Sequence, residues 1–278
     1  MHKFIVTHRD SALTLLHFIA NKLSLSNKKA KQLLDDRLVF VNRKRVWIAS
    51  YQLKTGDSIE VLSGKTRQPE KKKYDILFND DCYVIVSKPP GIVTNGQNSI
   101  ESDLQAQFNS DQIQAVHRLD KDTSGALIFA KNENAFEEMK KVFKKHEIQK
   151  IYRVIVMGKI CKPAFTINSP VGGQTAVTHI TLLKKGENTS YLEITTETGR
   201  MHQIRIHLAS IGHPVIGETE YARKQIENTL HRETKRQMLH AHRISFVHPY
   251  TKKEISATAP IPHDFIQCLR LLFSRVKP

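Results

Sequence analysis

The sequence predicts an α+β protein, with a large domain built on a mixed, largely antiparallel β-sheet and a small N-terminal α/β domain before it. Strand-like apolar segments recur along most of the 278 residues, and no regular strand–helix–strand repeat is present that would indicate a parallel sheet. Residues 1–63 instead carry two adjacent helical patterns followed by short strands. Residues 64–74 lack apolar periodicity and are typical of a solvated linker, so the large domain is expected over 75–278.

The composition is that of an ordinary soluble protein. Hydrophobic residues make up 40% and charged residues 25% of the chain. No apolar run is long enough to cross a bilayer, and the first residues lack the apolar core of a secretory signal. Cys82, Cys161 and Cys268 are scattered, which argues against a disulfide framework or a zinc site and suits a reducing compartment. A cytoplasmic protein without a membrane partner is therefore expected.

The net charge of +16 points to a polyanionic partner, because each lysine or arginine placed against a phosphate releases condensed counterions. Residues 1–75 hold 16 Lys and Arg against 7 Asp and Glu, so roughly half of the excess lies in the front part of the chain. An anionic membrane surface is the weaker interpretation, since no amphipathic helix with large aromatic anchors is present there. The N-terminal domain is expected to bind nucleic acid.

The N-terminal domain is predicted to contain two helices and short strands. Apolar residues recur at helical spacing between Ser11 and Leu23. Ser26 is a suitable N-cap for a second helix from Asn27 to Asp36, whose outer face carries lysines. Strands are expected at 38–41, at 46–48 and at the end of 53–61, with a basic turn at 42–45.

This order of elements, closing on Gly56-Asp57-x-Ile59-x-Val61, resembles the small RNA-binding domain of the ribosomal S-four type. In that family the second helix and the basic turn after it line the RNA-contacting face. The resemblance places six basic residues on that face: Lys28, Lys29, Lys31, Arg43, Lys44 and Arg45. Any one of these side chains fits an ordinary solvated surface, but the cluster favours RNA.

The large domain begins with a predicted strand, 83–86, that runs into the rigid turn Lys88-Pro89-Pro90-Gly91. Residues 126–130 form a second apolar strand, bounded by glycine. A lysine-rich amphipathic helix is predicted over 135–146, and further strands are expected at 152–156, 191–197 and 244–247.

Asp120 lies two residues after Arg118, in a tight polar loop between apolar segments. A carboxylate in such a loop is either a turn cap or a reactive group. Lys150 and Tyr152 stand together on a predicted strand, and residues 239–243 are rich in histidine. These positions are the candidates for chemistry.

Arg205 belongs to a further polar run, residues 198–207, that follows a glycine turn. If this run is extended, Arg205 shares a face with Gln203 and His207; if it is helical, Arg205 falls beside Leu208 instead. In either conformation Arg205 is able to reach a buried carboxylate.

Several enzyme classes lack their sequence signals in this chain. The histidines do not stand with cysteine or carboxylate residues at metal-ligand spacing, so no metal site is expected. No phosphate-binding loop, dinucleotide fingerprint or nucleophile elbow is present, which argues against phosphoryl transfer, hydride transfer and the common serine hydrolase design.

The large domain resembles the RluA-type pseudouridine synthases. The signature His-Arg-Leu-Asp-x-x-Thr-Ser-Gly stands complete at 117–125. The segment with Lys150, Tyr152 and Gly158 and the segment 198–207 match two further motifs. The turn at 88–91 matches the entry motif, although Ser87 stands where asparagine is common, and 212–217 and 239–242 match downstream markers. The resemblance covers nearly the whole chain.

The resemblance implies the pseudouridine synthase fold and an isomerase that converts uridine in RNA to pseudouridine without a cofactor. Asp120 matches the catalytic aspartate, acting either as a nucleophile on the sugar or as a base. Arg205 matches the arginine that pairs with this aspartate, and Tyr152 matches the tyrosine stacked on the extruded base. Arg118 matches a residue that displaces the nucleotide. Substrate contacts are further expected from His117, Lys150, Arg200 and His202.

The expected substrate is large-subunit ribosomal RNA of the 23S type, with transfer RNA as the alternative, and a monomer is expected. A non-catalytic RNA-binding or ribosome-assembly factor is a second alternative, but it predicts the loss of Asp120 or Arg205, and both are present. A hydrolase that uses two carboxylates is a weaker one, because Asp120 and Asp122 are too close in sequence to flank a sugar with any certainty.

Overall fold

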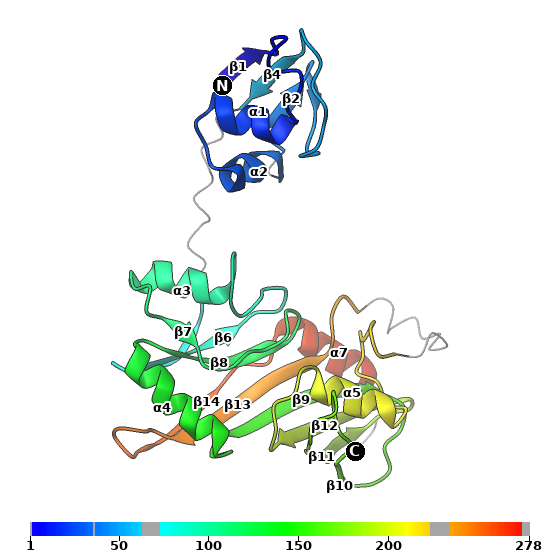
Figure 1. Ribbon diagram of the computed structural model, residues 1–278. Helices are drawn as coiled ribbons and strands as arrows, with labels where there is room; N and C mark the ends of the chain where they lie inside the picture. Colours follow the sequence, from blue (N-terminus) through cyan, green and yellow to red (C-terminus); the bar gives the residue numbers. More distant parts are fainter. Residues whose placement is uncertain (1, 36, 63–72, 223–233, 274–278) are drawn as a thin grey trace. The chain divides into compact units, whose positions relative to one another are not determined.

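The computed structural model describes the chain except residues 1, 36, 63–72, 223–233 and 274–278 (Figure 1). It divides into two compact units, Met1–Lys71 and Lys72–Pro278. Most of the predicted linker, 64–72, lies outside the described residues. Its last residue, Tyr74, is buried in the core of the second unit, where its hydroxyl donates a hydrogen bond to Asp103.

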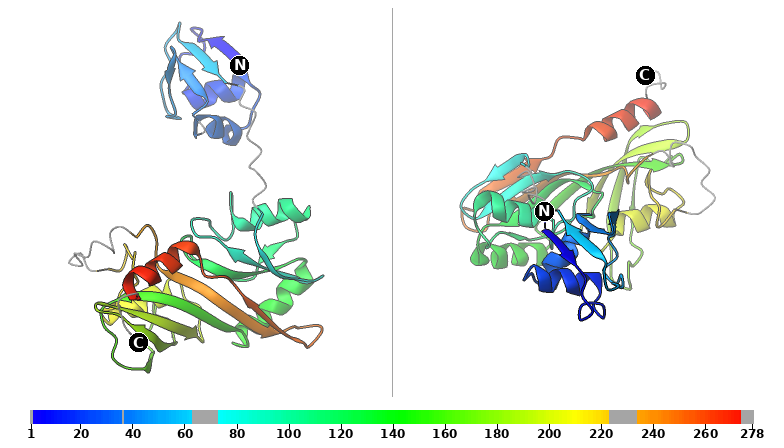
Figure 2. Two further views of the ribbon diagram at one scale, coloured as in Figure 1. Left: turned by 180° about the vertical axis from the view of Figure 1, so that it is seen from behind. Right: turned by 90° about the horizontal axis from the view of Figure 1, so that it is seen from above.

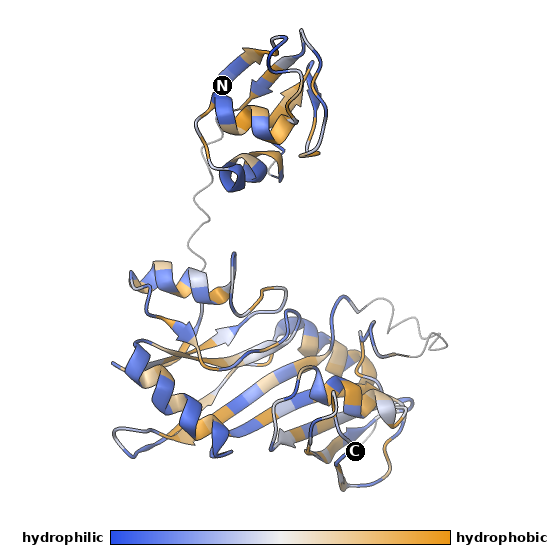
Figure 3. Cartoon of the chain, in the orientation of Figure 1, coloured by the Kyte–Doolittle hydropathy of each residue, from blue (hydrophilic) through white to orange (hydrophobic). Residues whose placement is uncertain are grey.

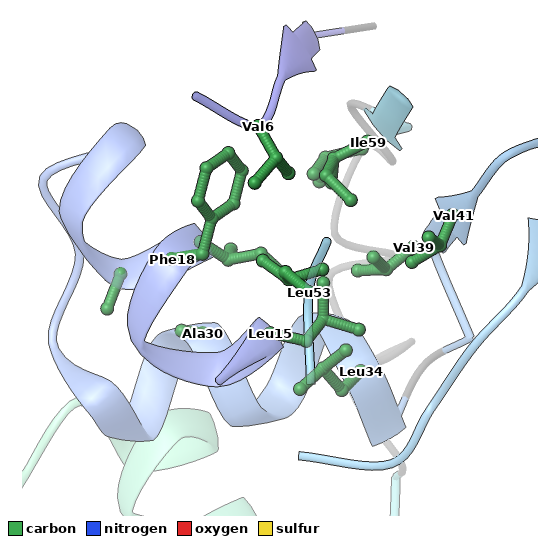
Figure 4. Close-up of a cluster of buried hydrophobic side chains, with 12 residues drawn as sticks. Val6, Leu15, Phe18, Ala30, Leu34, Val39, Val41, Leu53 and Ile59 are labelled. Atoms are coloured by element: carbon green, nitrogen blue, oxygen red, sulfur yellow. The ribbon is translucent and has the colours of Figure 1, made fainter. Parts of the chain in front are cut away.

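The first unit packs two helices, α1 (Leu15–Lys22) and α2 (Asn27–Asp35), against a small antiparallel sheet. Its strand order is β1-β4-β2-β3. The strands are β1 (His2–Ile5), β2 (Val39–Val41), β3 (Lys44–Arg45) and β4 (Ser58–Val61). Figure 4 shows the core between these layers, where Leu15, Phe18 and Leu34 from the helices meet Val39 and Ile59 from the strands. Burial of these side chains is the main stabilising term for so small a unit.

Two details of the first unit differ from the sequence prediction. The strand β1 was not predicted, because it is a mostly exposed edge strand without clear alternation. The strand predicted at 46–48 is wrong, since β2 pairs with Lys44 and Arg45. Asn42 and Arg43 both have positive φ angles of 49° and 63°, as a two-residue hairpin turn requires. This tight turn starts the return strand at Lys44 and leaves the next residues outside the sheet.

The second unit is built on one mixed sheet, which in the described residues has ten strands. The main strand order is β10-β11-β12-β9-β13-β8-β6-β5, with β14 paired to β13 and β7 to β8. All of these pairs are antiparallel except β13 with β8. The strands are β5 (Ile76–Asn79), β6 (Tyr83–Lys88), β7 (Gln114–Ala115), β8 (Ser124–Ala130), β9 (Gln149–Met157), β10 (Ala164–Ile167), β11 (Thr178–Lys185), β12 (Thr189–Thr196), β13 (Leu239–Val247) and β14 (Glu254–Thr258). The predicted α+β class with a largely antiparallel sheet is confirmed.

Four helices cover this sheet: α3 (Ile100–Phe108), α4 (Glu133–Lys144), α5 (Gln203–Ser210) and α7 (His263–Phe273). Helices α3 and α4 pack against alternate residues of β6 and β8, and therefore on opposite faces of those strands. Likewise α5 packs against Val154 and Val156 of β9, and α7 against Ile155. The view from behind in Figure 2 shows α7 over the strands, on the side away from α5.

Candidate active site

The loop that carries Asp120 enters the centre of the sheet at β8. Buried Lys88, at the end of β6, fixes this loop from below: its amine donates hydrogen bonds to the carbonyl oxygens of Lys121 at 2.9 Å and Thr123 at 2.7 Å. Burial lowers the pKa of Lys88 to about 8. The amide of Gly91 donates to Lys121 as well. The turn at 88–91 therefore acts as a clamp for the catalytic loop, a role that explains its place in the entry motif.

The next residues lock the loop to its neighbour strand. Gly125 has a φ of +127°, and a Cβ atom there would lie 2.2 Å from the carbonyl oxygen of Ala241 on β13. Only glycine allows this close approach of the parallel pair β8–β13. Ser124 bonds the buried His240 ring, with 3.0 Å between Oγ and Nδ1. The signature glycine is thus a packing requirement that sets where Asp120 leaves the sheet.

Arg205 reaches the loop from α5. The run after Gly199 is helical from Gln203, so the extended alternative is wrong. His202 takes the left-handed conformation before the helix, with a φ of 55°, and the side-chain oxygen of Gln203 accepts from the amide of Arg200. The guanidinium of Arg205 is buried, and its Nη1 lies 3.4 Å from Oδ2 of Asp120.

Two carboxylates that sequence reasoning missed hold the same guanidinium. Glu218, whose side chain is fully buried, accepts from Nε of Arg205 at 2.6 Å and from Nη2 at 2.8 Å. Glu220 lies 3.1 Å from Nη2, and the ring of Tyr221 lies under the guanidinium at 5.1 Å. The predicted marker 212–217 ends one residue before Glu218. Its glycine, Gly217, cannot hold a Cβ atom, which would lie 2.0 Å from the carbonyl oxygen of Arg236.

The charges in this cluster oppose the cost of burial. Burial acts to lower the pKa of Arg205, but the hydrogen bonds and charge of Glu218 outweigh it, so the pKa is raised and the guanidinium stays charged. Burial also acts to raise the pKa of Glu218, and the hydrogen bonds from Arg205 and from backbone amides lower it instead. The pair is therefore a fixed cation beside a fixed anion, which presents Arg205 to Asp120.

Asp120, Arg205 and Tyr152 line one hollow of about 90 Å³, together with Arg118 and His202. Tyr152 projects from β9, and burial, followed by the charge of Asp120, raises the pKa of its hydroxyl to about 12. The phenol is thus protonated at neutral pH. Arg118 is exposed and, among the described residues, has no polar partner, so its guanidinium is available to a ligand. The structure brings all three predicted catalytic residues together.

His202 stands between Asp120 and the carboxylates beside Arg205. Its Nε2 lies 3.6 Å from Oδ1 of Asp120, and its Nδ1 lies 2.8 Å from the hydroxyl of Tyr221. His207, by contrast, is fully buried, with both ring nitrogens bonded to Thr178 and to the carbonyl of Ser169. His202 faces the hollow and His207 is part of the scaffold.

The other predicted substrate contacts are placed differently. The Nε2 atom of His117 accepts from the amide of Ile128 at 3.1 Å, and burial lowers the pKa of the imidazole to about 3. This ring is neutral and held by the scaffold. Arg200 is exposed, and its Nε donates to the carbonyl of Thr175. The six basic residues predicted for RNA contact in the first unit are all exposed: Lys28, Lys29, Lys31, Arg43, Lys44 and Arg45. Figure 3 shows the hydrophilic surface that α2 presents there.

Among the described residues, one group has the spacing of metal ligands: Asp80, Cys82 and His248. Its atoms are already engaged. Nδ1 of His248 accepts from the amides of Tyr250 and Thr251, so Nε2 carries the proton and donates to Asp80 at 2.9 Å. Asp80 also accepts from the amides of Cys82 and Tyr83. This donor set fits a buried hydrogen-bond network that joins the ends of β6 and β13.

Comparison with known proteins places the same residues in one family. Residues 82–210 match the family model described as RNA pseudouridylate synthase. The chain is 33% identical to the uncharacterized RNA pseudouridine synthase YhcT of Bacillus subtilis, over 98% of this chain and 97% of that one. It is 29% identical to the ribosomal large subunit pseudouridine synthase D of Pasteurella multocida, over 89% and 87%. The solved structure of human RNA pseudouridylate synthase domain containing 4 shares the fold, with a TM-score of 0.61, 21% identity and coverage of 70% and 92%. In the described part of the chain, no helix combines the length and the apolar character that a membrane crossing needs.

Proposed function

The chain belongs to the RluA-type family of RNA pseudouridine synthases, and on this basis we propose that it isomerises specific uridines in large-subunit ribosomal RNA, with Asp120 as the catalytic carboxylate. The support is the meeting of Asp120, Arg205 and Tyr152 in one hollow, with 3.4 Å between the Asp120 carboxylate and the Arg205 guanidinium. Relatives such as the Pasteurella protein, named for the ribosomal large subunit, support the choice of RNA.

Each residue has a role that follows from its surroundings. Isomerisation breaks the bond between the sugar and N1 of uracil and forms one to C5, so the base must leave its stack and turn. Asp120 attacks the sugar or removes a sugar proton, and Arg205 keeps its carboxylate ionised and oriented. The ring of Tyr152 offers a face for the extruded uracil. Arg118, which is exposed at the mouth of the hollow, fills the space that the nucleotide leaves.

The same proposal covers the rest of the chain. Residues 1–63 act as an RNA-binding domain of the ribosomal S-four type, with the six exposed basic residues as its contact face. The enzyme works as a monomer in the cytoplasm and needs no cofactor, because the reaction neither adds a group nor changes oxidation state. Transfer RNA is the alternative substrate, and a non-catalytic assembly factor is the alternative role.

The test is pseudouridine mapping by carbodiimide modification in ribosomal and transfer RNA from cells that lack this chain. Wild-type protein should restore the missing sites, with no change in RNA mass, and Asp120→Asn should not. We expect the substitution to lower the rate by at least about 10³-fold, at the upper end of what one catalytic acid or base contributes. Restored sites with Asp120→Asn would exclude Asp120 as the catalytic group. Sites missing from transfer RNA alone would assign the alternative substrate.

A further inference from the structure

A second and larger hollow opens directly beside the one that holds Asp120. Its volume is about 460 Å³, within the range of small-ligand sites. The two hollows share Tyr152 and Arg118 on one side and Gly199 and Arg200 on the other. They therefore form one continuous depression, of which the Asp120 end has room for only part of a nucleotide.

The walls of this second hollow, which we call the side groove, come from four elements. Lys150 and Tyr152 lie on the same side of β9, two residues apart. Phe143 and Lys144 close the end of α4, and the ring of Phe143 packs against that of His117 with 5.2 Å between centroids. The wall opposite is the loop between β12 and α5. An aromatic surface therefore stands next to the position of the extruded base.

The charge in the side groove is mostly positive. Four cations line it, Arg118, Lys144, Lys150 and Arg200, against the single carboxylate of Glu197. That carboxylate is engaged elsewhere, because Nε2 of His179 lies 2.6 Å from it. His117 adds no charge, since its imidazole is neutral. The groove thus presents cations without matching anions.

Lys150 is the member with the fewest partners. Among the described residues its amine has no carboxylate within ion-pair distance, and its one hydrogen bond is a long one of 3.4 Å to the carbonyl of Thr198. Burial lowers the pKa of this amine, and no neighbouring anion opposes the shift. A Cβ atom on residue 199 would lie 3.7 Å from Nζ, so glycine there leaves the amine open to the groove. A half-buried ammonium without a counter-charge is a site for an anion.

We propose that the side groove binds the nucleotide next to the target uridine, with its phosphate on Lys150 and its base against Phe143. This inference rests on the proposed function, since it takes the ligand to be the RNA substrate. The phosphate supplies the counter-charge that Lys150 lacks, and stacking on the aromatic wall accepts any base. The groove holds the strand on one side of the reacting nucleotide while Asp120 acts on its sugar.

Binding of a fluorescein-labelled dodecamer of uridine tests the assignment, by fluorescence anisotropy between 50 and 300 mM KCl. The full chain is compared with Lys150→Met, Lys150→Arg and the matched control Lys140→Met, which removes an exposed lysine of α4 that is paired with Glu137. Each comparison is repeated after all six basic residues of the first unit are changed to glutamine, so that the first unit does not dominate binding. Thermal unfolding confirms that each variant is folded.

We expect Lys150→Met to reduce the slope of log K against log salt by about 0.7, the value for one phosphate contact on a single strand. Lys150→Arg should keep the slope, and Lys140→Met should not change it. With a dodecamer whose linkages are all neutral methylphosphonates, wild type and Lys150→Met should bind alike. A slope for Lys150→Met equal to that of the control, in both backgrounds, overturns the proposal. So does a Lys150→Met defect that persists on the neutral strand. The assay needs no turnover, so a changed slope without pseudouridine formation would reject the proposed function and keep the groove.

Discussion

At the scale of single residues, the contacts of Arg205 decide how Asp120 is presented. The guanidinium makes two short bonds to Glu218, at 2.6 and 2.8 Å, and only a longer one of 3.4 Å to Asp120. Glu218 therefore fixes the arginine, and Asp120 receives its charge without being locked in a two-point pair. A carboxylate held this way keeps an oxygen available for the sugar.

Glu218→Gln should destabilise the protein, because Arg205 stays buried while losing its anionic partner. Removing one partner of a buried pair typically costs about 3 kcal/mol or more. The folded-state pKa of Glu218 is lowered, so its contribution is present above the ordinary carboxyl range and is lost as the pH falls through and below it. Urea unfolding at pH 7 and pH 4 should show a gap between wild type and variant that shrinks at the lower pH.

The control for this prediction is Glu220→Gln, since Glu220 binds the same guanidinium from a half-exposed position. An exposed pair contributes less than about 1 kcal/mol. Equal losses for the two variants would show that burial of Glu218 is not what matters.

At the scale of elements, the parallel contact between β8 and β13 organises the site. It is the one parallel pair among the described strands of this sheet, and it joins the loop of Asp120 to a strand more than a hundred residues later. A register shift in β13 between Ala241 and Arg243 lets that strand pair with β9 as well. Buried His240 lies at the junction, bonded to Ser124 of β8 and near the carbonyl of Ala259.

His240→Gln should flatten the dependence of stability on acid pH. Burial lowers the pKa of His240 to about 4, so the folded protein resists the proton that the unfolded chain binds below about 6.5. The contribution of this residue is therefore complete at neutral pH and declines as the pH falls from 6.5 towards 4. Wild type should lose about 1 kcal/mol more per pH unit than the variant in that interval.

Urea unfolding at pH 7, 6 and 5 measures this difference. His263→Gln, at an exposed position on α7, is the matched control and should follow wild type. A wild-type curve parallel to that of His240→Gln would mean that the histidine is protonated in the folded protein.

At the scale of the whole molecule, the proposed division of labour assigns affinity to the first unit and chemistry to the second. Backbone contacts by basic residues raise affinity for any RNA, and they do so in proportion to the counterions released. Six exposed cations on one small unit suit that task, whereas the hollow with Asp120 holds a single nucleotide.

Changing these six residues to glutamine should weaken RNA binding and make it less sensitive to salt. If each side chain contacts one phosphate of a single strand, the slope of log K against log salt falls by about 4. Anisotropy titrations with labelled ribosomal RNA fragments over a range of KCl give this slope. Because the exposed positions carry no core contacts, the melting temperature should stay the same. An unchanged slope would remove the first unit from RNA binding.

The sequence was sufficient where local pattern and local chemistry decide the outcome. The apolar segments of β8 and β9 and the amphipathic α4 were predicted close to their observed bounds, because burial selects such patterns within one element. Strands β1 and β5 were missed, since they lie at sheet edges with exposed or half-buried residues. Helix α3 was missed too, because its pattern is short and weakly amphipathic.

What the sequence determined by itself is the class of fold, the family and the identity of Asp120, Tyr152 and Arg205 as candidates, because these rest on residue types at fixed spacing. Only the tertiary structure decided that Arg205 is helical, that Glu218 is its strongest partner and that Lys150 opens into a groove without a counter-charge. The physical reason is that pairing and burial are properties of residues far apart in the chain. Gly125 shows this directly: no local pattern reveals that its missing side chain makes room for the backbone of Ala241.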